Sequence, residues 1–256
     1  MTVKAKKHLG QHFLTDENIA RKIVDSLSYD GYDSVLEVGP GTGVLTKYLL
    51  EKPQNLNLAE IDTESIAYLQ ENYEKITEET FVGDFLKIDI DSLYENEVAV
   101  IGNYPYNISS QILFKVVDNF QKIPEMSGMF QKEVAERTAA VPRTKDYGIL
   151  SVLVQAYYDV KYLFTVHENV FNPPPKVKSG VILLTRNPKQ GLEGNEVLFK
   201  KIVKAGFNQR RKKLSNALKI LNIPESLKTH EFMDKRAEEL SVADFINFTE
   251  LWSKEA

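Results

Sequence analysis

A glycine-rich loop, Gly39-Pro-Gly-Thr-Gly43, follows an expected strand and begins an expected helix. Gly39 and Gly41 allow the backbone to approach a ligand closely at the N-terminus of that helix. The spacing is G-x-G-x-G and not the G-x-G-x-x-G of dinucleotide sites, because Val44 occupies the sixth position. By itself the loop is weak evidence for a ligand, since turns between strands and helices commonly contain glycine.

Two carboxylates at the ends of the next two expected strands make the loop more informative. Glu60 can accept hydrogen bonds from both hydroxyls of a ribose, and Asp84 can accept one from an adenine amine beside the ring of Phe85. A glycine loop, a ribose acid and an adenine acid in this order predict a site for S-adenosylmethionine. The residues expected to contact this cofactor are Gly39, Gly41, Glu60, Asp84 and Phe85.

The segment Asn103-Tyr-Pro-Tyr106 ends the fourth expected strand, at the sheet edge where such folds bind ligands. The 6-amino group of adenine is a poor nucleophile because its lone pair is delocalised into the ring. The side-chain oxygen of Asn103 and the carbonyl of Pro105 can accept both amine hydrogens, and Tyr106 can stack on a base taken out of its helix. Positioning and oriented dipoles would then supply most of the acceleration. Next to a nucleoside site, the segment predicts methylation of an adenine amine; elsewhere it would be an ordinary turn.

An alternation of strand and helix patterns positions these motifs. Apolar runs and alternating residues predict strands, and apolar residues at helical spacing predict helices. Strands are expected at 34–39, 55–61, 80–83, 97–102 and 126–130, and helices at 16–28, 44–50, 109–120, 147–157 and, capped by Thr63, directly after 63. This alternation predicts an α/β fold with a doubly wound parallel sheet.

The pattern changes after residue 157. Tyr158–Val166 and Gly180–Thr185 are expected strands without a helix between them, which predicts an antiparallel hairpin at the edge of the sheet. Residues 186–194 have the composition of a linker, and helices are expected at 197–207, 210–221, 230–240 and 242–253. The expected domains are therefore 1–188, with the cofactor motifs, and a small helical domain, 189–256.

Composition excludes several classes of protein. The 256 residues are 43% hydrophobic and 27% charged, and no run approaches the roughly 18 apolar residues of a membrane-spanning helix. The basic N-terminus has no apolar signal-peptide core. With no Cys, and no metal-ligand spacing among the four His, no disulfide, thiol nucleophile or metal site is expected. We therefore expect a cytoplasmic protein with neither a metal nor a membrane partner.

The net charge of −4 conceals an uneven distribution. Residues 186–256 contain 14 Lys/Arg against 10 Asp/Glu, whereas residues 51–97 contain 13 acids against three Lys. Such asymmetry favours a polyanionic partner on one face, although Lys/Arg runs also occur on solvated helix faces. The side chains expected to contact RNA phosphates are Lys4, Lys6, Lys7, Lys200, Lys201, Lys204, Arg210, Arg211, Lys212 and Lys213.

Further motifs extend along the chain in a fixed order. They are Leu9-Gly-Gln-His-Phe-Leu14, Glu60-Ile-Asp62, Gln131–Arg137, Tyr147–Ser151, Val170–Val177 and Phe207–Leu214. Together with the glycine loop and Asn103-Tyr-Pro-Tyr106, they resemble the KsgA/RsmA family of ribosomal small-subunit adenine dimethyltransferases over nearly the whole chain. The resemblance implies a Rossmann-like class I methyltransferase sheet with an antiparallel edge strand, followed by a small α-helical C-terminal domain.

The same resemblance assigns roles to residues outside the motifs already interpreted. It implies that the leader, through His12 and Leu14, closes over the cofactor, which Asn103 also contacts. Phe171 matches an aromatic residue that packs against the target base, although a core role for it stays open. Two positions depart from the family pattern: His12 is often Asn, and Tyr104 is usually aliphatic, which can alter the shape of the base pocket.

The resemblance also implies a substrate. A monomer of this family uses S-adenosylmethionine to add two methyl groups to each of two adjacent adenosines near the 3′ end of small-subunit (16S) rRNA, during biogenesis of the small ribosomal subunit. Two alternatives stay open. The related Erm macrolide-resistance enzymes share the catalytic motifs but modify large-subunit rRNA, and a ribosome-assembly factor could bind the same RNA with its catalysis secondary. The segment Arg210–Lys213 and its flanks favour the small-subunit enzymes.

Overall fold

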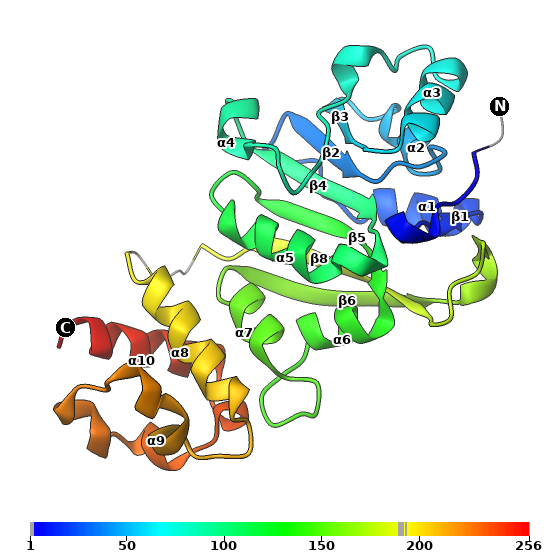
Figure 1. Ribbon diagram of the computed structural model, residues 1–256. Helices are drawn as coiled ribbons and strands as arrows, with labels where there is room; N and C mark the ends of the chain where they lie inside the picture. The colour runs from blue at the N-terminus through cyan, green and yellow to red at the C-terminus, as the bar shows by residue number, and fades with distance from the viewer. Residues whose placement is uncertain (1–2, 189–191, 193, 256) are drawn as a thin grey trace. The chain divides into compact units, whose positions relative to one another are not determined.

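The computed structural model describes residues 3–188, 192 and 194–255 (Figure 1). It contains two compact units: Met1–Ala135 with Val160–Arg186, and Glu136–Asp159 with Asn187–Ala256. Residues 136–159, which the sequence placed in the first domain, thus belong to the second unit, because the ring of Tyr147 packs 5.9 Å from that of Phe207. The expected domain boundary lies between residues 188 and 189. Residue 189 and part of the expected linker lie outside the described residues, so this boundary stays a prediction.

A six-stranded sheet forms the first unit (Figure 1). Its order is β3-β2-β4-β5-β8-β6, with β2 (Ser34–Val38), β3 (Asn55–Ala59), β4 (Val98–Asn103), β5 (Glu125–Gln131), β6 (Tyr158–Val166) and β8 (Ser179–Arg186). β2 pairs in parallel with β3 and β4, and β4 with β5, whereas β8 is antiparallel to β5. The expected parallel sheet with an antiparallel pair of strands at one edge is therefore confirmed.

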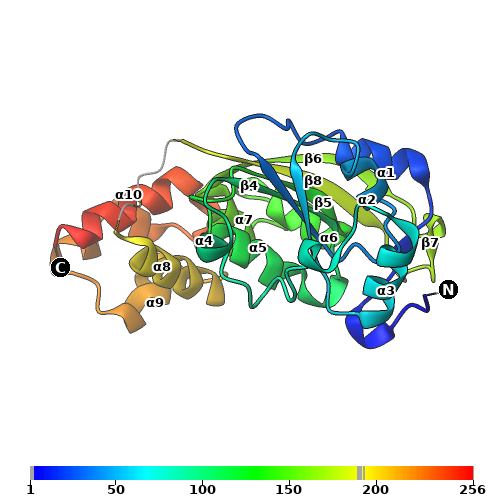
Figure 2. The ribbon, with the colours of Figure 1, turned by 90° about the horizontal axis from the view of Figure 1, so that it is seen from above.

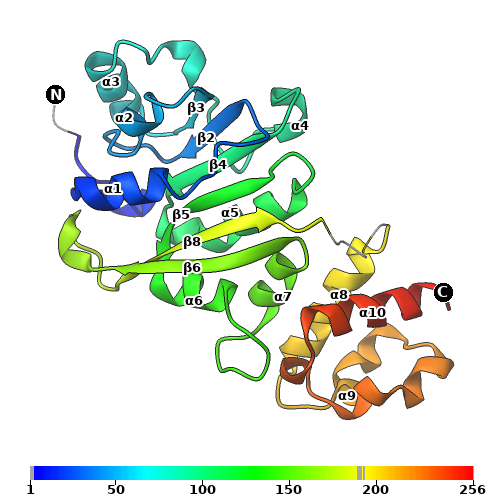
Figure 3. The ribbon, with the colours of Figure 1, turned by 180° about the vertical axis from the view of Figure 1, so that it is seen from behind.

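Helices cover both faces of this sheet. In Figures 2 and 3, α1 (Glu17–Val24) lies on one face and α5 (Ser109–Asp118) on the other. Helix α1 begins after Asp16, whose carboxylate accepts hydrogen bonds from two free N–H groups of the first turn. Its inner residues Ile23 and Val24 join the core with Ile101 and Val181 of the sheet. Burial of each such side chain stabilises the fold by about 1.5–3 kcal/mol.

The leader, residues 3–14, lies at the carboxyl edge of the parallel strands. It contains one turn of 3₁₀ helix, Lys7–Leu9, and the short strand β1 (Phe13–Leu14), which pairs antiparallel with β7 (Phe171–Asn172). Thr15 adds two hydrogen bonds to the carbonyl of Val170, from its N–H (2.8 Å) and its hydroxyl (2.9 Å). This pairing was not predicted, because its two segments are more than 150 residues apart.

Several local expectations for the first unit were wrong. Residues 80–83 form no regular strand: a 3₁₀ turn, Glu78–Thr80, is followed by a single parallel bridge between Phe81 and Leu58. Helix α3 (Thr63–Asn72) is capped by Asp62 and not by Thr63. The remaining α-helices are α2 (Thr46–Leu49) and two that the sequence did not predict, α4 (Ile90–Leu93) and α6 (Lys132–Thr138).

The second unit is helical, as expected, with α7 (Ile149–Gln155), α8 (Glu196–Asn208), α9 (Leu214–Ala217) and α10 (Val242–Ser253). Phe199, Phe207, Phe245 and Phe248 are buried in its core. The helix expected at 210–221 is only α9 and a 3₁₀ turn, because Lys213 pairs with Arg236 as an isolated antiparallel bridge. The helix expected at 230–240 is two 3₁₀ turns. No helix within the described residues is long and apolar enough to span a membrane.

Candidate active site

A cavity of about 190 Å³ lies at the carboxyl ends of β2, β3 and β4. Leader residues Leu9–Phe13, the glycine loop and the segment Asn103–Ile108 contribute to its lining. Most residues predicted to bind cofactor or substrate line this one cavity: His12, Gly39, Gly41, Glu60, Asp84, Asn103, Pro105 and Tyr106. Motifs separated by more than 90 residues in the sequence thus meet at one sheet edge.

Three aromatic or aliphatic residues predicted for the site do not line this cavity. Phe171 and Leu14 are only 4% and 3% exposed, because the β1–β7 pairing places them opposite each other within the core. Leu14 does contact a cavity of about 20 Å³ behind the glycine loop. Phe85 is 3% exposed and does not line the main cavity, where the neighbouring Leu86 supplies apolar surface.

Sequence reasoning missed Ile61, which lines the cavity directly after the ribose acid. Its side chain is 56% exposed, which is unusual for a large aliphatic residue in this fold. Exposed apolar surface beside a polar group is typical of a ligand-binding wall. The sequence did contain a signal for Ile61. It directly follows Glu60, at the end of an expected strand that reaches the sheet edge where ligands bind.

The glycine loop requires its glycines for two physical reasons. Gly39 and Gly41 have φ values of +69° and +57°, in the left-handed region that side chains disfavour. A Cβ atom at Gly41 would also lie 2.8 Å from the ring of Phe13 in the leader. Leader and loop can therefore approach each other only because residue 41 has no side chain.

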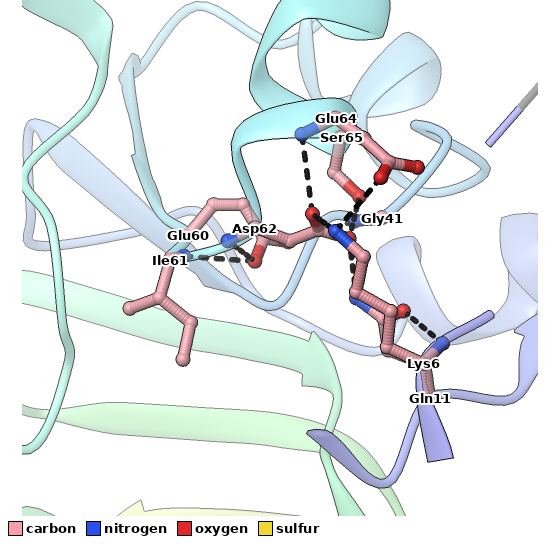
Figure 4. A network of polar contacts seen from close by, with 8 residues as sticks. All are labelled: Lys6, Gln11, Gly41, Glu60, Ile61, Asp62, Glu64 and Ser65. Atoms are coloured by element: carbon pink, nitrogen blue, oxygen red, sulfur yellow. Dashed lines mark hydrogen bonds and ion pairs between the residues drawn. The ribbon is translucent and has the colours of Figure 1, made fainter. Parts of the chain in front are cut away.

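Glu60 is held by main-chain groups and is 7% exposed (Figure 4). Its Oε1 accepts hydrogen bonds from the N–H groups of Ile61 (2.8 Å) and Asp62 (2.9 Å), and its Oε2 from that of Gly41 (3.3 Å). Burial raises the pKa of Glu60, and these three N–H groups oppose the increase. Each carboxylate oxygen has two lone pairs, so Oε2 retains capacity for a ribose hydroxyl.

Asp62 joins the leader to the same region (Figure 4). Its Oδ1 lies 2.5 Å from Nζ of Lys6, and its Oδ2 accepts hydrogen bonds from Nε2 of Gln11 (3.0 Å) and from the hydroxyl of Ser65 (3.1 Å). The ammonium of Lys6 also lies 3.2 Å from Glu64. These donors lower the pKa of Asp62 against the effect of its burial. Lys6, predicted to contact RNA phosphates, is therefore occupied by two carboxylates of its own chain.

The side-chain amide of Asn103 has a defined orientation. Its Nδ2 donates a hydrogen bond to the carbonyl of His12 (2.8 Å), which assigns Oδ1 as the acceptor that remains. The carbonyl of Pro105 accepts two long hydrogen bonds, from the N–H of Ile108 (3.3 Å) and the hydroxyl of Ser109 (3.4 Å). Both predicted acceptors for an adenine amine thus sit in the cavity wall within three residues.

Aromatic rings surround this segment. Tyr106 is half-buried, its hydroxyl is hydrogen-bonded to Ser179, and its ring centroid lies 5.4 Å from that of His12. Burial raises the pKa of Tyr106, so the phenol is protonated near neutral pH. His12 is positioned by a 2.8 Å hydrogen bond between Nδ1 and the carbonyl of Pro173.

Tyr104, which departs from the family pattern, is buried beneath the segment. Its hydroxyl donates to the carbonyl of Ser127 (2.8 Å), and its ring stacks on Phe130 with centroids 4.5 Å apart. A Cβ at Gly128 or Gly102 would lie 2.4 Å or 3.0 Å from this ring. Two glycines on neighbouring strands therefore accommodate the larger residue, and Tyr104 fills the core beneath the substrate segment.

The predicted phosphate-binding side chains fall into two groups. Lys4, Lys7, Lys201, Lys204, Arg211 and Lys212 are exposed to solvent, whereas Lys200 is half-buried. Lys213 is exposed but lies 2.8 Å from Asp234, and Arg210 binds Glu238 and two carbonyl groups. Lys6, Arg210 and Lys213 are thus ion-paired with acids of this chain, and contact of the ten side chains with RNA phosphates stays a prediction. Within residues 3–188, 192 and 194–255, no cluster of His, Asp and Glu is arranged to hold a metal ion.

Comparison with known proteins places this arrangement in a family. Residues 2–254 match the family described as ribosomal RNA adenine dimethylase. The protein named ribosomal RNA small subunit methyltransferase A from Flavobacterium johnsoniae is 59% identical over 249 residues, 97% of this chain and 95% of that protein. Its namesake from Cytophaga hutchinsonii is 55% identical over 253 residues, 98% of each chain.

Solved structures agree with this assignment. A dimethyladenosine transferase from Plasmodium falciparum has a TM-score of 0.80 and 25% identity, covering 95% of this chain and 98% of that one. The 23S rRNA methyltransferase ErmE has a TM-score of 0.68 at 23% identity, covering 93% and 99%, and so shows a shared fold. The expected class I methyltransferase fold is confirmed, and S-adenosylmethionine is the methyl donor of such enzymes. With its motifs gathered in one cavity and its whole length matched, the chain belongs to the ribosomal RNA adenine dimethylase family.

Proposed function

We propose that this enzyme transfers methyl groups from S-adenosylmethionine to the 6-amino groups of two adjacent adenosines near the 3′ end of small-subunit rRNA. The orientation of Asn103 carries the proposal: Nδ2 is bound to the carbonyl of His12, so Oδ1 is the end of the amide that can accept from a substrate. The relatives compared above, named small subunit methyltransferase A, support the choice of RNA.

In this proposal polar and apolar groups of the cavity wall bind different parts of the cofactor. Glu60 accepts hydrogen bonds from the ribose, Asp84 accepts one from the adenine amine, and the backbone at Gly39 and Gly41 lies against the methionine part. Ile61 and Leu86 supply apolar surface for the adenine ring, in place of the predicted Phe85. When bound, S-adenosylmethionine supplies a methyl group on a positively charged sulfur.

The residues of the Asn103 segment act on the target amine. Oδ1 of Asn103 and the carbonyl of Pro105 accept its two hydrogens, which directs the nitrogen lone pair at the methyl carbon. Both oxygens would stabilise the positive charge that develops on the amine as it accepts the methyl group that a bound cofactor would supply. The amine then loses its proton to water. Tyr106 stacks on the extruded base, and Phe171 supports the leader from within the core.

Measurement of methyl transfer tests the substrate. Purified enzyme with labelled S-adenosylmethionine is offered immature small subunits, large subunits and duplex DNA in parallel. We expect label in small subunits, recovered as N6,N6-dimethyladenosine. Label only in large subunits would support an Erm-like activity instead, and binding to small subunits without transfer would support an assembly factor whose catalysis is secondary.

A further inference from the structure

Arg210 holds a neighbouring loop of the second unit in place. Its Nε lies 2.5 Å from Oε2 of Glu238, and its Nη1 and Nη2 donate to the carbonyl oxygens of Lys145 (2.7 Å) and Thr144 (2.9 Å). All three nitrogens of the guanidinium thus have partners within the chain. Such a planar fork can bind a carboxylate and two carbonyls at once, which a lysine ammonium cannot do in the same geometry.

The loop that Arg210 holds spans residues 141–146, and hydrogen bonds fix its main chain. We call it the basic loop, after Arg143 and Lys145, which are both exposed. The N–H of Arg143 donates to the carbonyl of Glu238 (2.8 Å), so Glu238 contacts the loop through its main chain and Arg210 through its side chain. Arg143 has a φ of +67°, a conformation that costs a non-glycine residue free energy and often marks a functional position.

Free positive charge remains on this surface after its internal ion pairs are formed. Arg210 neutralises Glu238, and Lys213 neutralises Asp234. In the described part of the chain, no ion-pair partner is found for the exposed side chains of Arg143, Lys145, Arg211 and Lys212. The loop itself carries one acid, Asp146. The bridge between Lys213 and Arg236 and the contacts of Arg210 bring the loop, residues 210–213 and residues 235–238 together.

We propose that the basic loop is an RNA-binding element, in which Arg143 and Lys145 contact backbone phosphates beside Arg211 and Lys212, and that Arg210 is a positioning residue that acts through the loop. This inference rests on the proposed function, since it takes small-subunit rRNA as the polyanion. Unpaired Arg and Lys side chains on a main chain fixed by hydrogen bonds are suited to phosphate oxygens, which position an RNA without reading its sequence.

Two variants, one that removes two positive charges and one that leaves the net charge unchanged, separate the two parts of the proposal. The variant Arg143→Ala/Lys145→Ala removes the two proposed phosphate contacts. The slope of its log RNA affinity against log salt should become less steep by about 1.4 to 1.8, because each phosphate contact contributes about 0.7 to 0.9. Arg210→Lys keeps the charge but loses the fork. We expect it to weaken RNA binding about tenfold and to lower the salt slope although the net charge is unchanged. Its KM for RNA should rise while kcat stays at the parent value.

The matched control is Arg21→Lys, the same substitution at an exposed position of the first unit that has no part in the proposed RNA-binding surface. It should leave both the affinity and the rate of trypsin cleavage in the basic loop unchanged, whereas Arg210→Lys should accelerate cleavage after Arg143 and Lys145. Adding Arg210→Lys to Arg143→Ala/Lys145→Ala should weaken binding no further, because Arg210 acts through the loop. Thermal unfolding of each variant checks that the fold is retained.

The parent enzyme's methylation of small subunits is measured in the same series. If the parent transfers no label to small subunits, the proposed function fails, whatever the variants do. If the parent is active but Arg143→Ala/Lys145→Ala keeps its salt slope, or Arg210→Lys binds RNA as tightly as the parent, the proposal for the basic loop is wrong.

Discussion

At the scale of single residues, one hydrogen bond decides what Asn103 can do. An amide that donates to the carbonyl of His12 at 2.8 Å presents its oxygen, and not its nitrogen, to a substrate. The same bond joins the leader to the end of β4. In the proposed mechanism, the leader therefore also fixes the orientation of the Asn103 amide.

The first prediction concerns this amide. Asn103→Ala should keep most of the RNA affinity but reduce the rate of methyl transfer about 10²- to 10³-fold, because one acceptor for the developing charge is lost. Asn103→Asp is the informative companion, since it keeps an acceptor oxygen, loses the donor to His12 and adds a negative charge. Single-turnover transfer at saturating cofactor measures both. Parent-level transfer by Asn103→Ala would remove Asn103 from the mechanism.

A second residue-scale prediction concerns Glu37, which lies beneath the glycine loop. It is 1% exposed and accepts a 2.7 Å hydrogen bond from the hydroxyl of Thr46. Burial raises the pKa of Glu37 to about 8, from 4.5. Between these two values the unfolded chain is ionised while the folded one stays protonated, so Glu37 lowers the free energy of unfolding as pH rises.

Glu37→Gln cannot ionise and should remove this dependence. Relative to the parent, the variant should gain stability between about pH 4.5 and pH 8, at no more than about 1.4 kcal/mol per pH unit. Urea unfolding at several pH values measures it, with Glu51→Gln at an exposed position as the matched control. Parallel stability curves for parent and Glu37→Gln would show that the buried carboxyl is ionised in the folded state.

The sequence predicts best those residues whose role depends on the spacing of neighbouring motifs. Glu60 follows β3, Asn103 ends β4 and Asp84 follows the parallel bridge between Phe81 and Leu58, so all three lie at one edge of the sheet. For Phe171 the sequence left both a base-pocket and a core role open, and the structure buries it in the core, where it pairs with a leader more than 150 residues away. Spacing along the chain contains no information about such a contact.

At the scale of elements, the leader is the segment whose place the sequence leaves most open. The pattern of apolar residues predicted the strands of the sheet, of which β2, β4 and β5 are buried along nearly their whole length. It also predicted a helix at 230–240, where the apolar residues instead serve two 3₁₀ turns. In the leader, hydrogen bonds and ion pairs fix the chain, and these have no sequence period.

The element-scale prediction tests the contacts of the leader. Asp62→Asn keeps a side chain able to cap α3 but loses the charge that attracts Lys6, which lies 2.5 Å away. We expect S-adenosylmethionine to dissociate about three- to tenfold faster, and trypsin to cleave the leader after Lys6 more readily. Stopped-flow release of the cofactor measures the first effect.

Glu64→Gln is the comparison for that variant. Glu64 also contacts Lys6, at 3.2 Å, but is 51% exposed and receives no hydrogen bond from Gln11. Glu64→Gln should accelerate the release of S-adenosylmethionine less than Asp62→Asn does. Equal release rates for Asp62→Asn and the parent would show that the Lys6–Asp62 contact does not hold the leader over the cavity.

At the scale of the whole molecule, the net charge of −4 does not describe how charge is distributed along the chain. The acids of residues 51–97 include Glu60, Asp62 and Asp84, which serve the cavity and the leader. Several cations that looked free in the sequence are neutralised by acids of their own unit, such as Lys6 and Arg210. We therefore expect RNA binding to depend on where the unpaired cations lie and not on the net charge of the chain.

The last prediction separates the effect of where the unpaired cations lie from the effect of the net charge. Lys201 and Lys204 are exposed and three residues apart in α8, so they share one face of the helix. Lys201→Ala/Lys204→Ala should lower the slope of log RNA affinity against log salt by about 1 to 2. Lys47→Ala/Lys52→Ala removes the same charge from side chains that are ion-paired with Glu17 and Asp25, and should leave the slope unchanged. If both double variants shift the slope equally, the net charge of the enzyme, and not the placement of its unpaired cations, governs RNA binding.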